Sequence, residues 1–356
     1  MQSAQMFPDD FDGIISGSSA ADFNHLQSWT ARFRTITGAE GNDTFLSADD
    51  WSLVNSYVVE QCDEPIDGVS DGILEDPLQC QFDVSAIPVC ESDDSTGCLT
   101  ATQIQTVEDV YTPLYFGDSL VYPALLYGSE IDAVRLGLLD GSENGIARAF
   151  FQGGVYNDSS FDITTITKED MMLASSQDAL HGYPSAFDGD LSGFQAAGKK
   201  MMMYHGMADP MVSGANSQRY YQKVAQTMGL GNDAIDEFYR LYRISGMAHC
   251  GVGGISGAGP WMFGQSGAAS AASNNIVDNL VNWVENNDAP ETLLGTKFWY
   301  DTPSMGIEYE RAHCRYPYRT TYQGGDSTVA ESWGCELIED WQDCAGVTCN
   351  ADGSFA

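Results

Sequence analysis

Basic residues are scarce in this sequence. Its 356 residues contain 15 Lys and Arg but 51 Asp and Glu, so the formal net charge is −36 at pH 7. A chain this acidic repels the phosphate backbone of nucleic acids and the anionic surface of membranes. Apolar runs of about 18 residues, which a membrane-spanning helix needs, are also lacking. We therefore expect neither nucleic acid nor a membrane as a partner.

A signal peptide is also lacking, because Met1-Gln2-Ser3-Ala4 contains neither a basic nor an apolar segment. The cysteines nevertheless indicate an oxidising, extracellular compartment, since eight of the nine form close pairs that suit disulfides. The pairs are Cys62 with Cys80, Cys90 with Cys98, Cys314 with Cys335, and Cys344 with Cys349, and Cys250 is left over.

Two N-glycosylation sequons, at Asn42 and Asn157, agree with a secreted glycoprotein. A secreted type of chain that has no signal peptide and an odd cysteine leads us to expect that an N-terminal segment is missing. The hydrophobic fraction of 43% is enough for a large core, in one large domain or in two to three smaller ones.

Strands and helices alternate in two separate parts of the chain. This alternation predicts an α/β fold with a doubly wound parallel sheet that is covered on both faces. We assign residues 1–40 and 199–356 to this domain. The predicted elements are a helix that ends near residue 7, strands over 11–17, 201–205 and 238–244, and helices over 216–228, ended by Gly229, and around 276–284.

The segment between these parts, residues 41–198, is turn-rich, acidic and aromatic, and it contains the first four cysteines. It is expected to be inserted between two neighbouring strands of the sheet as a disulfide-rich lid domain. Helices are predicted over 102–111 and 168–176. The aromatic stretch 150–156 is typical either of a ligand surface or of a small satellite core.

Two strands run into loops that each carry one titratable side chain, Asp209 after the first and His249 after the second. In doubly wound sheets, functional groups lie in loops at the carboxyl ends of strands. A carboxylate followed by a histidine is the order found in α/β-hydrolases, where the two serve a serine nucleophile. Taken singly, Asp209 before Pro210 is ordinary turn chemistry and His249 an ordinary polar residue. Their placement after consecutive strands makes a joint site as good an interpretation as two separate ordinary residues.

No nucleophile presents itself. A serine elbow needs glycines two residues before and after the serine, and neither residues 264–268 nor residues 17–21 have both. Cys250 adjoins His249, but neighbouring side chains usually point apart. We interpret His25, His181 and His205 as polar residues with satisfied hydrogen bonds, and His313, into which no apolar strand leads, as structural.

An acidic loop is the one candidate metal site. Residues 67–73 alternate aspartates with turn residues, and Asp63 and Glu64 precede them. Carboxylates and carbonyls on a tight loop suit Ca²⁺, which takes 6 to 8 oxygen ligands. In a chain this acidic, a chance cluster of turn aspartates is the alternative.

The chain resembles the tannase and feruloyl esterase family of secreted α/β-hydrolases. The resemblance spans nearly the whole chain and rests on five pieces: residues 7–17, the loop from Cys62 to Cys80, residues 204–209, residues 246–250 and the tail from Cys314 to Cys335. It implies an ester hydrolase with a Ser-Asp-His triad, a lid inserted between strands, and calcium in that lid.

By this resemblance Asp209 is the triad acid and His249 the general base. Cys250 is expected to form the family's disulfide to a cysteine just before the nucleophilic serine. In the family, that Cys-Ser pair precedes the helix that leads into residues 7–17, and this chain starts inside that helix. The serine, its cysteine, the oxyanion-hole donors and the early strands are therefore expected to be missing, which leaves the sheet incomplete at the N-terminus.

The resemblance also implies a calcium ligand set. It consists of Glu64, Asp67, the carbonyl of Val69, Asp71 and the carbonyl of Ile73. The family's first aspartate corresponds to Glu64, and Asp63 lies one residue further out. Which of these two is the first ligand stays open.

We therefore predict a carboxylic ester hydrolase for aromatic esters of the feruloyl or galloyl type, including esters attached to plant polysaccharide, with the lid forming an apolar wall for the acyl group. The chain by itself is expected to be inactive, because it lacks the nucleophile. The alternative is a non-catalytic, secreted, calcium-stabilised binding protein on the same scaffold, which the presence of both Asp209 and His249 disfavours. A peptidase has no sequence feature in its favour.

Overall fold

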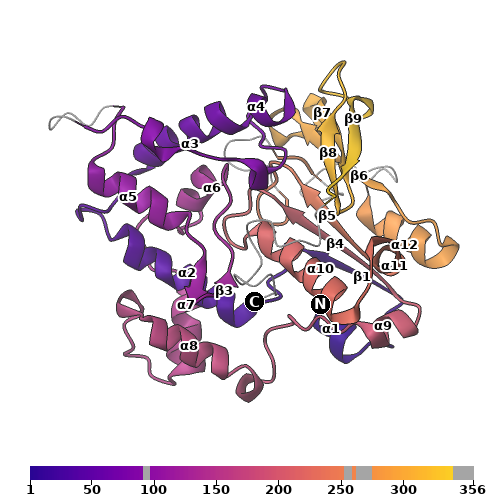
Figure 1. Ribbon diagram of the computed structural model, residues 1–356, viewed down its shortest axis with the longest axis horizontal. Helices are drawn as coiled ribbons and strands as arrows, with labels where there is room; N and C mark the ends of the chain where they lie inside the picture. The colour runs from indigo at the N-terminus through magenta and orange to yellow at the C-terminus, as the bar shows by residue number, and fades with distance from the viewer. Residues whose placement is uncertain (91–96, 252–258, 262–274, 340–356) are drawn as a thin grey trace.

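A three-stranded parallel sheet positions the two loops of interest. The computed structural model describes residues 1–90, 97–251, 259–261 and 275–339. The sheet has the order β1 (Gly13–Gly17), β4 (Lys200–Gly206), β5 (Tyr239–Ile244), and Ile15 lies beside Met202, which in turn lies beside Arg240. The chain from β1 to β4 is therefore inserted between neighbouring strands, as the sequence predicts (Figure 1).

Alternate side chains of β4 face opposite sides of the sheet and pack into separate cores. Met201 and Met203 belong to one buried cluster with Tyr220 and Val224 of α10 (Gly214–Met228). Met202 and Tyr204 belong to another, with Leu280 and Trp283 of α12 (Ile276–Asn286). Since a strand alternates its faces, the sheet is covered on both sides, which confirms the sequence-based prediction.

The regular elements of the inserted segment are mostly helices, and Figure 1 shows most of them gathered to one side of the sheet, whereas α9 lies at the other end. Its elements, with those that flank it, are α1 (Gln2–Met6), α2 (Phe23–Thr37), α3 (Ala48–Cys62), α4 (Glu64–Asp67), α5 (Ala101–Val110), the antiparallel strands β2 (Leu114–Phe116) and β3 (Ser119–Tyr122), α6 (Glu130–Arg135), α7 (Gly145–Ala149), α8 (Lys168–Ser176) and α9 (Ser192–Ala196). Helices α5 and α8 match their predicted ranges within one residue.

Helix α2 contributes to the core of this inserted segment. Trp29 and Phe33 of α2 lie in one buried cluster with Trp51 and Val107 of the segment. Phe151 belongs to the same cluster, in a π-helical turn over Phe150–Val155. The aromatic stretch 150–156 therefore packs as core, one of its two sequence interpretations. The domain boundary at residue 40 stays a prediction. Helix α2 lies before this boundary in the sequence but packs in the core of the segment that follows it.

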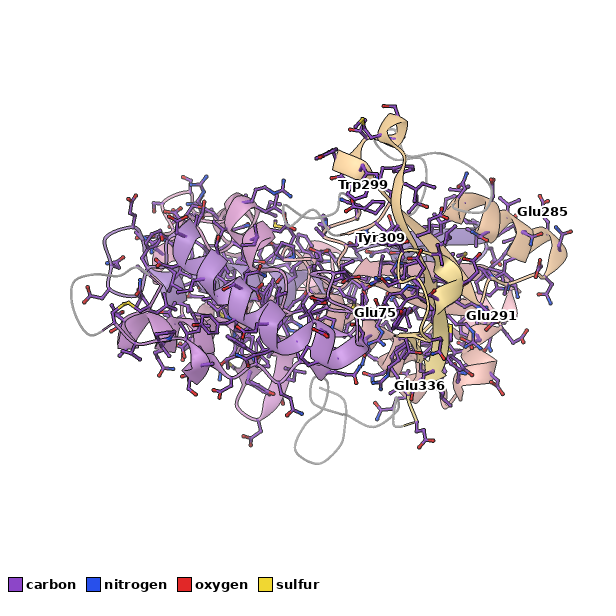
Figure 2. The ribbon with its side chains drawn as sticks, turned by 90° about the horizontal axis from the view of Figure 1, so that it is seen from above. Glu75, Glu285, Glu291, Trp299, Tyr309 and Glu336 are labelled. Carbon is purple, nitrogen blue, oxygen red and sulfur yellow. A yellow bond between two sulfur atoms is a disulfide. The ribbon has the colours of Figure 1, made fainter. Side chains whose placement is uncertain are left out.

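Two antiparallel hairpins follow the sheet and α11 (Asn232–Asp236): β6 (Thr292–Phe298) pairs with β7 (Ile307–Cys314), and β8 (Tyr318–Tyr322) with β9 (Trp333–Leu337). Figure 2 shows Trp299 near the tip of the β6–β7 hairpin, which projects from the molecule. His313 lies within β7, which agrees with the expectation that no apolar strand leads into it. Its strand is rich in polar residues and so lacks the apolar pattern that identifies the sheet strands.

Disulfides join three of the four predicted cysteine pairs: Cys62–Cys80, Cys90–Cys98 and Cys314–Cys335. The fourth, Cys344 with Cys349, lies outside the described residues. Among the described helices, none is long and apolar enough to cross a membrane.

Candidate active site

The loops after β4 and β5 touch through their backbones at the carboxyl end of the sheet. The Ala208 amide donates to the carbonyl of Met247 at 3.0 Å. A side chain at Gly206 would collide here, since a Cβ would lie 2.2 Å from the Met247 oxygen and 2.3 Å from that of Ala248. Glycine is thus required at this close approach, which brings the loop of Asp209 against the loop of His249.

Asp209 and His249 are joined by a hydrogen bond of 2.7 Å between Oδ2 of the aspartate and Nδ1 of the histidine. The Asp209 side chain is fully buried, whereas that of His249 is 41% exposed. The backbone amides of Met211 and Val212 donate to the other carboxylate oxygen, Oδ1, at 2.8 and 3.1 Å. The aspartate is therefore fixed, and the histidine presents its far edge to solvent.

The hydrogen bond between Asp209 and His249 changes the pKa values of both side chains. Burial alone raises the pKa of Asp209, but hydrogen bonds from the side chains of His205 and His249 outweigh it and lower the pKa to about 2. The hydrogen bond to Asp209 raises the pKa of His249 above its ordinary value, although burial opposes it. A carboxylate that stays ionised beside a more basic imidazole has the charges that the acid–base pair of a hydrolase triad requires.

His205 is a third member of this cluster, which the sequence interpretation missed. Its ring is fully buried, and Nε2 lies 3.2 Å from Oδ2 of Asp209 and 2.8 Å from the carbonyl of Val212. Nδ1 lies 2.6 Å from the hydroxyl of Ser217. The prediction of satisfied hydrogen bonds is confirmed, but no sequence pattern marked the contact with Asp209.

An apolar pocket of about 170 Å³ opens beside His249. Its walls come from α2, from the loop of Asp209 and from the start of α7: Ala20, Phe23, Leu26, Gln27, Thr30, Asn144, Ile146, Met211, Val212 and His249. The buried side chains of Gln27 and Thr30 make no hydrogen bond to another described residue, so their polar groups are available to a ligand. Only Asn144 and Ile146 come from the predicted lid range.

No serine hydroxyl within the described residues is hydrogen-bonded to His249. Ser18, which follows β1, accepts a hydrogen bond of 3.1 Å from the backbone amide of Cys250. Cys250 lies outside the three disulfides and has a positive φ of 60°. The serine of residues 264–268 lies outside the described part of the chain.

In the acidic loop, three aspartates fold back on the backbone. Oδ2 of Asp63 accepts from the Gly72 amide at 2.8 Å, Oδ1 of Asp67 accepts from the Val69 amide at 2.8 Å, and Oδ1 of Asp71 accepts from the Ile73 amide at 3.0 Å. The remaining oxygens of Asp63 and Asp67 are buried and have no hydrogen-bond partner. Burial, with nearby carboxylates adding to it, raises the pKa of Asp63 to about 6 and that of Asp67 to about 7.

The predicted metal ligands are not all brought together. Glu64 is exposed, whereas Asp63 is buried in the loop. Asp71 forms an ion pair of 2.6 Å with Arg311. Among the described residues, no three His, Cys, Asp or Glu side chains are grouped so as to hold a metal ion. Two buried carboxylate oxygens without partners nevertheless fit a hard cation, since such oxygens are costly unless they bind one or are protonated.

A parallel sheet that carries a buried carboxylate and a histidine on the loops after neighbouring strands is that of an α/β-hydrolase, and the solved structures that resemble this chain have the same fold. The chain belongs to the tannase and feruloyl esterase family, whose model matches residues 1–129 and 137–336.

Named relatives agree with this family. A probable feruloyl esterase B-2 from Aspergillus terreus is 39% identical over 94% of this chain, and one from Aspergillus fumigatus is 40% identical over the same share. The chain spans 63% of the length of these relatives. The crystal structure of feruloyl esterase B from Aspergillus oryzae gives a TM-score of 0.86 at 39% identity, over 94% of this chain and 66% of that one. Tannin acyl hydrolase from Aspergillus niger, at 20% identity and a TM-score of 0.76, shares the fold.

Proposed function

We propose that this chain carries the acid–base half of a carboxylic ester hydrolase that cleaves aromatic esters of the feruloyl or galloyl type. The 2.7 Å hydrogen bond between Asp209 and His249, beside an apolar pocket, is the observation that carries the proposal. The family supports the reaction class. The activity is proposed for the whole protein, because the chain spans only part of the length of its relatives.

In the proposed mechanism, Nε2 of His249 takes the proton of a serine hydroxyl as its oxygen attacks the ester carbonyl. The same proton then passes to the leaving alcohol as the acyl–enzyme forms, and a water molecule activated by His249 releases the acid. Asp209 holds the Nδ1–H tautomer of His249 and stabilises the imidazolium. The nucleophilic serine stays a prediction outside this chain, as does the disulfide between Cys250 and the cysteine just before that serine.

The pocket beside His249 suits the aromatic acyl group. Its volume of about 170 Å³ is close to that of a cavity which holds a benzene ring, about 150 Å³. Phe23 and Leu26 supply apolar contact, and Gln27 and Thr30 supply hydrogen-bonding groups for hydroxyl or methoxy substituents of the ring. A polysaccharide attached through the alcohol side of the ester would then extend away from this pocket.

Calcium is proposed as a structural ion of the acidic loop, held by Asp63, Asp67, Asp71 and the carbonyls of Val69 and Ile73. Asp63 replaces Glu64 in this set because its carboxylate is buried in the loop while Glu64 is exposed. The ion would neutralise the clustered carboxylates and stabilise the loop between Cys62 and Cys80. The three disulfides support secretion.

Two measurements test the proposed function. Methyl ferulate should bind the 356-residue protein and shift the NMR signals of His249, without turnover. Turnover would contradict the prediction that the nucleophile lies outside the chain, and the absence of binding would contradict the aromatic substrate. The coding sequence upstream of Met1 decides between enzyme and binding protein: an in-frame Gly-Cys-Ser-x-Gly-Gly supports the enzyme, and a stop codon supports the binding protein.

A further inference from the structure

His205 is a buried histidine with a partner on each ring nitrogen. Its Nε2 faces two oxygens, the carbonyl of Val212 at 2.8 Å and Oδ2 of Asp209 at 3.2 Å. Its Nδ1 faces the hydroxyl of Ser217 at 2.6 Å. The ring comes from the end of β4 and the hydroxyl from α10, so the contact joins the strand to the helix that follows it.

The partners determine which nitrogen carries the proton. A backbone carbonyl can only accept a hydrogen bond, so Nε2 must donate to Val212. Oδ2 of Asp209 shares the same N–H, because both oxygens lie on that side of the ring. Ser217 can donate its hydroxyl to Nδ1, and this leaves His205 neutral in the Nε2–H tautomer.

We propose that His205 is a positioning residue that holds Oδ2 of Asp209 in line with Nδ1 of His249 by donating a second hydrogen bond to that oxygen. The positioning role of His205 in catalysis rests on the proposed function. The hydrogen bonds of His205 themselves do not depend on that function.

The two oxygens of Asp209 are then held differently. Backbone amides of Met211 and Val212 fix Oδ1, and only side chains hold Oδ2. Without His205, Oδ2 would retain His249 as its one donor among the contacts described. A fully buried carboxylate that loses a donor becomes easier to protonate, and a protonated Asp209 cannot stabilise the His249 imidazolium. The ionisable groups that face Asp209 are His205, His249 and, from β3, Tyr122.

Histidine-selective ¹⁵N and ¹³C labelling makes the arrangement measurable, because the chain has only five histidines. In the unaltered protein at neutral pH we expect the ¹⁵N shifts of His205 to report a ring that carries its proton on Nε2. A ring protonated on Nδ1 at neutral pH would overturn the proposal. This measurement needs no turnover, so its failure is distinct from a failure of the proposed esterase activity.

Two substitutions test the effect on Asp209. His205→Leu removes the donor, and His205→Gln keeps an amide N–H near the place of Nε2. The pH at which the His249 signals report protonation of Asp209 should rise by about one pH unit or more in H205L, and H205Q should restore much of the difference. His313→Leu, which also removes a fully buried histidine, should leave this titration unchanged. The proposal is overturned if H205Q behaves like H205L, or if H313L shifts the titration equally; the tautomer measurement remains decisive should H205L fail to fold.

Discussion

The backbone of Gly206 lies directly against the carbonyl oxygen of Met247. The amide of Ala208 also donates to that oxygen, so the two loops that carry Asp209 and His249 are joined by main-chain contact before their side chains meet. The contact between Asp209 and His249 therefore depends on Gly206, a residue that has no side chain.

Replacing Gly206 by alanine should separate the loops. The added Cβ would lie 2.2 Å from the Met247 oxygen, and forced overpacking of this kind typically costs about 1–3 kcal/mol. We expect a lower midpoint of thermal unfolding and a changed His249 NMR signal. Gly153→Ala is the matched control, since a Cβ there meets no atom within 4 Å. Unchanged His249 signals in G206A would show that the contact is unimportant for the pair.

The sheet and the proximity of Asp209 and His249 were predictable because their signals are local in sequence. Apolar strands ending at Gly206 and Ile244 run into short loops, and the loops of parallel neighbours meet at one edge of a sheet. The insertion between β1 and β4 followed from the change of composition after residue 40. Helix α2, however, joins the core of the inserted segment, because burial depends on which partner an apolar helix face meets in three dimensions.

Contacts that depend on the path of the chain were not predictable. His205 reaches Asp209 because the backbone turns sharply after β4. Glu64 fits the expected spacing for a calcium ligand, but at the start of α4 it faces solvent while Asp63 is buried. Arg311 lies far along the chain from its partners Asp71 and Glu75, and no pattern within either segment marks that pairing.

Substituting Asp209 by asparagine should lower the pKa of His249. In the folded protein a hydrogen bond and the charge of Asp209 raise this pKa, and burial opposes them. With the charge removed, burial dominates, and the pKa should fall below the ordinary value of 6.5. The pH titration of histidine-labelled protein measures it. Asp326→Asn, at an exposed turn, should leave His249 unchanged and thereby exclude an effect of total charge. A His249 pKa that stays raised in D209N would mean that another group is responsible.

His313 should make the protein less stable in acid. Burial, aided by the charge of Arg311, lowers the pKa of His313 to about 3 from 6.5. Between these pH values the unfolded chain binds a proton that the folded protein does not. The free energy of unfolding should therefore fall as pH decreases, by up to about 1.4 kcal/mol per pH unit.

His313→Leu should remove the contribution of His313 to the dependence of the free energy of unfolding on pH. Urea unfolding at several pH values between 4 and 6.5, which lie between the two pKa values of His313, measures it. His181→Gln, at an exposed histidine, is the control and should keep the wild-type slope. An identical pH dependence in H313L and the wild type would show that His313 is protonated in the folded protein without cost.

Calcium should raise the thermal stability of the protein, and a chelator should remove the gain. A ligand that binds only the folded state at about 100 times its Kd adds about 2.7 kcal/mol. Asp67→Asn and Asp63→Asn should abolish the response of the unfolding temperature to Ca²⁺. Glu64→Gln should retain it, because Glu64 is exposed. If Glu64→Gln abolished the response to Ca²⁺ and Asp63→Asn retained it, Glu64 would be the first ligand. If the wild type showed no response to Ca²⁺, the calcium site would be excluded.

Gln27 should select for substituted aromatic rings. Its side chain is 4% exposed, lines the pocket beside His249 and makes no hydrogen bond to the described residues around it. A ring hydroxyl that pairs with this amide should gain about 1 kcal/mol, roughly a fivefold difference in Kd. Gln27→Leu should therefore weaken binding of methyl ferulate while leaving methyl cinnamate, which lacks the ring substituents, unaffected or tighter. Calorimetric titration measures both, with Gln105→Leu on the exposed face of α5 as the control. A hydrogen bond to a ring substituent affects only the ester that carries the substituent. An equal loss of affinity for the two esters would therefore show that Gln27 acts by shaping the pocket and not by such a hydrogen bond.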